Sequence, residues 1–270
     1  MDSNVSFKKT SAFRQAASMM RADARRMVRS KLFYIVLACA LIIPILMTVM
    51  MTMMDGSVSV DPNTGVETVI KGPENAWQSI GNIPGVGETM GGMDVMSMCN
   101  INMMFMGVAV FICLFISDDF RSGYAKNIFT VRAKRGSYII SKTVMGFICG
   151  ALMLIAYFIG AMIGGALSGL SFSLYSMSGF NIAMCMISKI FLMLVFVSID
   201  VIISVIAKQR AWLCLCGSLG VGMILFMMVS MITPLSSTMI NVAFCFIGGA
   251  IFAFGLGVLS RSVLCKTRIV

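Results

Sequence analysis

The segment DDFRSGYAKNIFTVRAKRGSYIISK, residues 118–142, is basic and amphipathic and lies between two long uncharged runs. Read as a helix, its residues Phe120, Tyr124 and Ile128 fall on one face, because they are spaced four residues apart. The cationic side chains fall elsewhere, so one side of the segment is apolar and the other is charged. A helix with these charges does not cross a bilayer, and the pattern predicts that it lies along the membrane surface.

Two acids open this segment. Asp118 and Asp119 stand where carboxylates accept hydrogen bonds from the open N–H groups of a first helical turn and oppose the positive end of the helix dipole. We therefore expect a helix to begin at Asp118. Because the segment lies outside the membrane, it would be available to a soluble partner.

The composition is that of an all-α protein that crosses a membrane several times. Of the 270 residues, 59% are hydrophobic and 12% are charged, whereas soluble domains carry roughly 25% charged residues. The net charge of +10 does not indicate a nucleic-acid partner, because basic residues of membrane proteins gather in cytoplasmic loops. The first 31 residues are too long and too charged for the start of a signal peptide, so we expect the first apolar run to be retained.

The remaining chain divides into apolar runs that are long enough for a bilayer core, which needs about 20 helical residues. Between the first two runs, residues 55–94 are rich in acids, Gly and Pro and are expected to form an extracytoplasmic loop, with a short interfacial helix around Trp77 as an option. A re-entrant half-helix near Pro234 is an alternative to a tight hairpin between the last two runs. The six expected spans are residues 32–54, 95–117, 143–168, 181–207, 211–233 and 238–260.

Residues 11–30 form a second amphipathic element. Phe13, Met20 and Met27 fall within its apolar arc, and arginines occupy the opposite side, so an interfacial helix is predicted. A basic tail that only orients the protein is the alternative. In the third span, glycines recur at the spacing typical of close helix packing, namely Gly146 with Gly150 and Gly160 with Gly164.

The distribution of positive charge favours six spans with both termini on one side. Nineteen of the 21 Lys and Arg residues lie in the amino-terminal region, the segment 118–142, the turn 208–210 and the tail 261–270, and the exceptions are Lys71 and Lys189. Since positive residues collect on the cytoplasmic side, we expect cytoplasmic termini in a bacterial cell membrane.

Ionisable residues occur inside the fourth expected span. Lys189 and Asp200 share a helix face about 16 Å apart, too far to pair, and Asn181 and Ser204 lie close to the same stripe. A charge at the membrane centre costs roughly 2.5–3.5 kcal/mol, so the stripe is predicted to line an internal interface or a substrate path. The alternative is that Lys189 extends to the headgroups and that Asp200 forms only local hydrogen bonds.

Few residues suit catalysis or metal binding. Histidine is absent, which removes the commonest general base and metal ligand. Residues 136–143, GSYIISKT, lack the second glycine of a phosphate-binding loop, so we expect no catalytic residue and no bound cofactor in this chain. The 28 methionines, dense in 47–54 and 96–104, leave a copper pathway as a less favoured alternative to apolar packing.

The order of these elements resembles the permease subunits of ABC-2 type ABC exporters, particularly the small ones for peptide antibiotics, lantibiotic immunity and drug efflux. The local match is an acid followed by Phe-Arg-Ser-Gly (120–123), Lys-Asn-Ile (126–128) and a closing Ser-Lys (141–142). This is similar to the family's acid-x-x-x-Gly stretch followed by Arg and Lys before the third span. Gly123-Tyr124 departs from the family's common Gly-Thr.

The resemblance implies a coupling helix near residues 118–129 that docks into a groove of a cytoplasmic ATPase dimer, which would bind ATP and Mg. A second permease subunit would complete the path for a hydrophobic or amphipathic substrate, a peptide or an antibiotic. A stand-alone immunity or sensor protein is the alternative. On physical grounds, Phe120, Tyr124 and Ile128 would form an apolar anchor. The coupling residues implied are Asp118, Asp119, Phe120, Arg121, Gly123, Tyr124, Lys126 and Ile128.

Overall fold

The computed structural model describes residues 12–60, 67–69, 72–81, 100–131, 135–174 and 177–266. This part of the chain is mainly helical. Five helices are long and apolar enough to cross a membrane, and α8 contains a shorter apolar stretch, Ala211–Phe226. The elements are α1 (Ala12–Arg29), α2 (Lys31–Met53), β1 (Val58–Val60), β2 (Glu67–Val69), η1 (Ala76–Ser79), α4 (Met103–Arg121), α5 (Tyr124–Val131), α6 (Arg135–Leu167), α7 (Gly179–Ala207), α8 (Ala211–Ile232) and α9 (Met239–Lys266).

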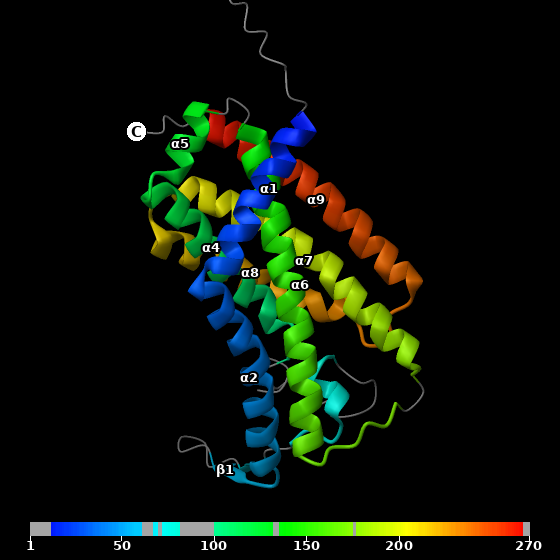
Figure 1. Ribbon diagram of the computed structural model, residues 1–270. Helices are drawn as coiled ribbons and strands as arrows, with labels where there is room; N and C mark the ends of the chain where they lie inside the picture. The colour runs from blue at the N-terminus through cyan, green and yellow to red at the C-terminus, as the bar shows by residue number, and fades with distance from the viewer. Residues whose placement is uncertain are drawn as a thin grey trace, which may run out of the picture.

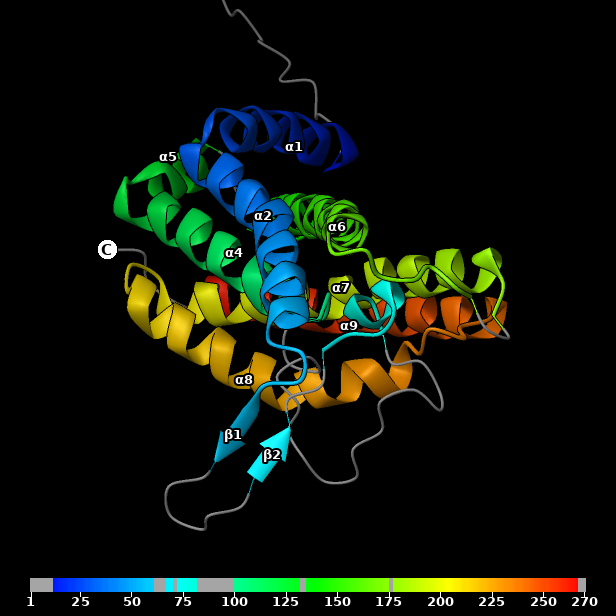
Figure 2. The same cartoon turned by 90° about the horizontal axis from the view of Figure 1, so that it is seen from below.

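The long helices alternate in direction along the bundle (Figure 1). α2 packs along α6, α7 packs along α9, and α4 contacts α6, α7 and α8. Figure 2 shows α7 and α9 side by side, with α1 lying outside α6. We call the end of the bundle that carries α1 and α5 the α1 end, and the opposite end, with η1 and the β1–β2 hairpin, the η1 end.

α1 forms where the amphipathic pattern over residues 11–30 indicated a helix. Met27 is buried and Met20 is half-buried, while the side chain of Phe13 lies outside the described part. Arg21 and Arg25 are exposed on the other side. The apolar face packs chiefly on α6, so burial of this face, rather than helix propensity alone, holds the helix in place.

The chain bends at Gly123, not at Asp118. The prediction that a helix begins at Asp118 is wrong, because α4 continues to Arg121 and so places Asp118 and Asp119 in its last turn. Gly123 then adopts a φ of 75°, a backbone conformation that glycine reaches without the steric cost of a Cβ atom and that commonly ends helices. α5 begins at the next residue, Tyr124.

The ends of the second and third expected spans also differ from the prediction. α4 covers Met103–Arg121 instead of 95–117, and residues 82–99 lie outside the described part. α6 begins at Arg135 instead of residue 143, so residues 135–142 belong to a long helix and not to a surface segment. Lys142, at the end of this segment, can lie inside the bundle because, as described below, it has partners of opposite charge there.

The described part of the loop 55–94 is tied to the connection between α6 and α7. The short helix expected at Trp77 is present as η1, and the Asn75 side chain caps it by accepting from the Trp77 N–H. Asn75 Nδ2 donates to the Ser173 carbonyl (2.7 Å), and Trp77 Nε1 donates to the Phe172 carbonyl (3.2 Å). The antiparallel β1–β2 hairpin was not expected from the sequence.

The glycines of α6 allow close helix packing, as their spacing predicted. A Cβ atom on Gly160 would lie 2.3 Å from the Leu41 carbonyl oxygen of α2, and one on Gly150 would lie 2.6 Å from Met193 Cγ of α7. Real Cβ atoms do not approach so closely, so both contacts require glycine.

α8 and α9 are joined by a tight hairpin and not through a re-entrant half-helix. α8 runs without a break to Ile232, and α9 begins at Met239. Leu235 is buried in the turn after Pro234, and the Ser237 N–H donates to the Pro234 carbonyl. Proline at this place removes a helical hydrogen bond and so favours the end of α8.

Candidate functional site

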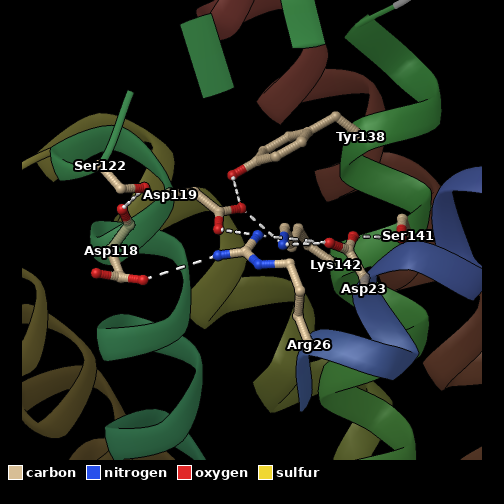
Figure 3. Close-up of polar contacts among 8 residues, drawn as sticks. All are labelled: Asp23, Arg26, Asp118, Asp119, Ser122, Tyr138, Ser141 and Lys142. Carbon is tan, nitrogen blue, oxygen red and sulfur yellow. Dashed lines mark hydrogen bonds and ion pairs between the residues drawn. The ribbon is translucent and has the colours of Figure 1, made fainter. Parts of the chain in front are cut away.

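Four charged side chains from three helices meet near the α1 end (Figure 3). We call Asp23 and Arg26 of α1, Asp119 of α4 and Lys142 of α6 the charge cluster. The side chains of Asp23, Asp119 and Lys142 are fully buried, and that of Arg26 is 29% exposed. Two acids and two bases therefore balance one another in a region with little access to water.

Lys142 occupies the centre of the charge cluster. Its Nζ atom lies 3.0 Å from Asp23 Oδ1 and 2.6 Å from Asp119 Oδ2. The Ser141 hydroxyl donates to the other oxygen of Asp23, Oδ2 (2.6 Å), and the Tyr138 hydroxyl donates to the same Asp119 Oδ2 atom as Lys142 (3.0 Å). Consecutive turns of α6 thus supply three of the groups that hold both acids.

Arg26 connects α1 to the junction of α4 and α5. Its Nη1 atom donates to Asp119 Oδ1 (2.6 Å), and its guanidinium carbon lies 4.0 Å from the centre of the Tyr124 ring. Burial lowers the pKa of Arg26, but the negative charge and hydrogen bond of Asp119 outweigh burial, so the net pKa is raised. Burial, followed by the charge of Asp23, raises the pKa of Tyr124, which keeps the phenol neutral beneath the cation.

The geometry suits a mechanical connection better than catalysis. Each buried charge has a partner of opposite sign, and the Lys142 amine and the Ser141 hydroxyl both donate to carboxylates of the cluster. A buried ion pair adds little net stability compared with apolar packing, but removing one member costs about 3–5 kcal/mol. The cluster therefore specifies how α1, α4 and α6 are oriented relative to one another.

The predicted coupling residues divide between the interior and the surface. Asp119 and Phe120 are buried, and Tyr124 and Ile128 are half-buried. Phe120 packs its ring against that of Tyr138, with centres 6.3 Å apart, and Ile128 packs against the core. Phe120 is thus occupied by its own chain, whereas Tyr124 and Ile128 keep part of their surface exposed, and an apolar anchor for a partner stays a prediction for these two. The exposed members are Asp118, Arg121 and Lys126, and Gly123 forms the bend between α4 and α5.

Lys189 of α7 is fully buried, so the alternative in which it extends to the headgroups is wrong. Its Nζ atom donates to Asn102 Oδ1 at the start of α4 (2.6 Å) and to Thr233 Oγ1 at the end of α8 (3.0 Å). Within the described residues, no carboxylate lies within 4.0 Å of it. A polar contact of three helices takes the place of an ion pair.

Asp200 lies eleven residues after Lys189 in α7, near the start of α8. Its side chain is 3% exposed, and in the described chain its Oδ2 atom has no hydrogen-bond partner. Ser204 donates to the Asp200 backbone carbonyl (2.6 Å) and lies 3.0 Å from Cys214 Sγ of α8. Asn181, which accepts from Ser178, joins neither group. The stripe is thus two separate interhelical contacts.

Sequence reasoning placed Asp119 in the site but missed Asp23, Arg26 and Tyr138, and it took Lys142 for a surface residue. One signal was available. Asp23 is the only acid between residues 3 and 54 and shares the apolar face of its helix with Met27. An acid on a buried face requires a cation nearby, although the pattern does not identify which one.

Comparisons of the chain with protein-family models, with curated proteins and with solved structures gave no match. The functional conclusion therefore depends on the charge cluster, on the exposed face of the α4–α5 junction and on the order of the apolar helices.

Proposed function

We propose that this chain is the membrane-spanning permease subunit of an ATP-driven ABC exporter of the ABC-2 type. The observation that carries the proposal is the charge cluster, which joins the α4–α5 junction to α1 and α6 through buried ion pairs. A force applied to α5 from outside the membrane would then move three helices together. Such a transmission element is what a permease needs when a separate subunit hydrolyses ATP.

The proposed membrane arrangement has six spans: the five helices that are long and apolar enough, and α8 in addition, which is the fifth span in chain order. With 22 residues, α8 is about 33 Å long and matches a hydrocarbon core of about 30 Å. The described ends of the helices near α1 carry most of the basic residues, and the positive-inside rule makes that end cytoplasmic. Both termini would lie in the cytoplasm of a bacterial cell, with α1 along the inner leaflet.

The proposed ATPase contact is the exposed side of the α4–α5 junction. Arg121 and Lys126 are exposed there, and neither forms an ion pair within the described part of the chain. α5 is a helix of eight residues whose apolar side is occupied by its own core, so its partner would recognise the charged side. A second permease subunit would complete a path for a hydrophobic or amphipathic substrate, a peptide or an antibiotic, and ATP and Mg would bind to the ATPase.

Co-purification tests this proposal. The tagged chain is expressed together with a candidate ATP-binding-cassette subunit from the same organism, extracted in mild detergent and assayed for retained ATPase. The double variant Arg121→Glu with Lys126→Glu is expected to lower retention at least tenfold, roughly the effect of reversing two complementary charges at an interface. Arg25→Glu is the matched control, because Arg25 is also exposed near the same end but lies on α1.

Transport in sealed vesicles provides the second measurement. The wild-type complex should move substrate only with ATP, and the double variant should lose transport in parallel with ATPase retention. A chain that binds its ligand but never retains an ATPase, with the double variant behaving as wild type, would contradict the exporter and favour an immunity or sensor protein.

A further inference from the structure

A pocket of about 300 Å³ lies near the α1 end, where α2 begins, α4 ends and the turn between α7 and α8 approaches them. Leu32 and Leu114 line its apolar part, and Ser30, Ser117 and Arg121 line its polar part. Because the apolar helices are long enough to cross a membrane, their ends lie at the level of the lipid headgroups. The pocket is therefore placed where headgroups and the first carbons of acyl chains meet the protein.

The pocket contains a buried hydroxyl that lacks a partner. Ser117 lines it and is 4% exposed, yet within the described chain its Oγ atom makes no hydrogen bond. A buried hydroxyl without a partner costs free energy, so a ligand in the pocket that accepts a hydrogen bond from Ser117 would offset that cost.

Two opposite charges flank this hydroxyl. Arg121 and Asp118 lie one turn apart on α4, and both line the pocket. Within the described residues Arg121 has no ion pair, and Asp118 is 67% exposed with its nearest cation, Arg26 Nη2, at 3.7 Å. The pocket thus presents one free guanidinium and one accessible carboxylate to the same ligand.

The beginnings of two helices add further positive potential. α2 begins at Lys31 after Ser30, whose side chain does not cap the helix, and α8 begins at Ala211 without a side-chain cap. Ser30 and Ala211 both line the pocket. The Ala211 N–H donates to the Gln209 carbonyl, and the other N–H groups of the two first turns attract anions, phosphate in particular.

We propose that this pocket binds the headgroup of a phospholipid that carries a phosphate and a primary amine. Arg121, the Ser117 hydroxyl and the helix N-termini suit the phosphate, because guanidinium and hydroxyl groups donate to its oxygens. Asp118 suits the ammonium group, and Leu32 and Leu114 contact the first part of an acyl chain. A headgroup with only negative charge would lie beside the Asp118 carboxylate, and a choline headgroup has no N–H to donate. Arg121 also lies on the proposed ATPase contact, so the lipid site is tested on the isolated chain, and the buried Ser117 separates lipid binding from ATPase retention.

Native mass spectrometry of the delipidated full chain tests the proposal. Phosphatidylethanolamine, phosphatidylglycerol and phosphatidylcholine with identical acyl chains are added at equal concentrations, and soluble phosphoethanolamine is added in a separate arm. Phosphatidylethanolamine is expected to bind about tenfold more tightly than the other two lipids and than the soluble headgroup, which lacks the acyl contacts. Ser117→Ala and Arg121→Gln should each lower its binding, and Asp118→Asn should abolish the preference over phosphatidylglycerol.

Ser188→Ala is the matched control, because Ser188 is also a buried serine whose hydroxyl lacks a partner in the described chain but lies in α7, away from the pocket residues. It should leave lipid binding unchanged. Equal binding of the three lipids, a preference for phosphatidylglycerol, or unaltered binding in Ser117→Ala and Arg121→Gln would each overturn the assignment. Binding of soluble phosphoethanolamine as tightly as the lipid would show that the ligand is a free phosphate compound and would also overturn it.

Discussion

The charge cluster and the polar residues of α7 handle buried charge in opposite ways. In the charge cluster, Lys142 and Arg26 are matched by two carboxylates at 2.6–3.0 Å. In α7, Lys189 is bonded to neutral oxygens and Asp200 has a carboxylate oxygen without a partner in the described chain. Both regions are buried between helices, so the difference lies in the partners and not in the exposure.

This difference separates a rigid connection from contacts that tolerate change. Where opposite charges are fully paired, removing one leaves the other buried and uncompensated, and the orientation of the helices is strongly specified. Where a charged group has only neutral partners or none, replacing it removes a desolvation cost together with its hydrogen bonds, and the two effects offset one another. The following substitutions test this comparison.

Lys142→Met should have the largest effect. It leaves the Asp23 and Asp119 carboxylates with only Arg26 as a cation, and we expect a loss of about 3–5 kcal/mol in the free energy of unfolding. The measurement is a denaturant titration in detergent. Asp118→Asn is the control, because Asp118 is largely exposed and its removal should cost less than about 1 kcal/mol. Equal losses in the two variants would show that the charge cluster is not a connected unit.

Gly123→Ala should have the second largest effect, because it changes the bend that brings Asp119 and Tyr124 together. The φ of 75° costs a residue with a Cβ atom about 1–2 kcal/mol. A Cβ atom there would meet no neighbour within 4 Å, so the loss would report backbone strain alone. Gly255→Ala in α9 is the control: it also meets no neighbour and should stabilise the helix by up to about 1 kcal/mol. A stabilising Gly123→Ala would contradict the left-handed bend.

Lys189→Met should cost about 1 kcal/mol, much less than Lys142→Met. Asn102 Nδ2 keeps its bond to Ser230, and the Thr233 hydroxyl keeps its bond to the Val229 carbonyl, so the Asn102 Oδ1 acceptor is the group that loses its donor. The same titration measures this loss. A cost as large as that of Lys142→Met would mean that Lys189 is as strongly coupled as the charge cluster, and the comparison would fail.

Asp200→Asn should have the smallest effect on stability, below about 1 kcal/mol in either direction, because it alters a side chain that already has an unpaired oxygen. The free energy of unfolding and the transport rate in vesicles should both be measured for this variant and for the wild type. A lower rate at unchanged stability would support a role of α7 in the substrate path. Unchanged rates in both Asp200→Asn and Lys189→Met would remove that role.

The helices themselves were predictable from local sequence. Apolar runs such as 32–54 and 211–233 predict helices because a backbone in lipid must satisfy its own hydrogen bonds, and α2 and α8 confirm the helices at these places within one residue at each end. The hairpin at Pro234 and the close packing at Gly160 follow from the same kind of local rule. The end of α4 was not predictable in this way, because the acids that resemble a helix start are held in a last turn by cations from other helices.

By itself, the sequence determined that the chain is helical, apolar and asymmetric in charge, since each of these properties depends on neighbouring residues. Only the tertiary structure decided which charges pair. Lys142 and Asp23 are 119 positions apart, and Arg26 and Asp119 are 93 positions apart, distances over which helical periodicity says nothing about contact. The physical reason is that helix packing brings these side chains into a region with little water, where removing one member of an ion pair leaves the other buried and uncompensated.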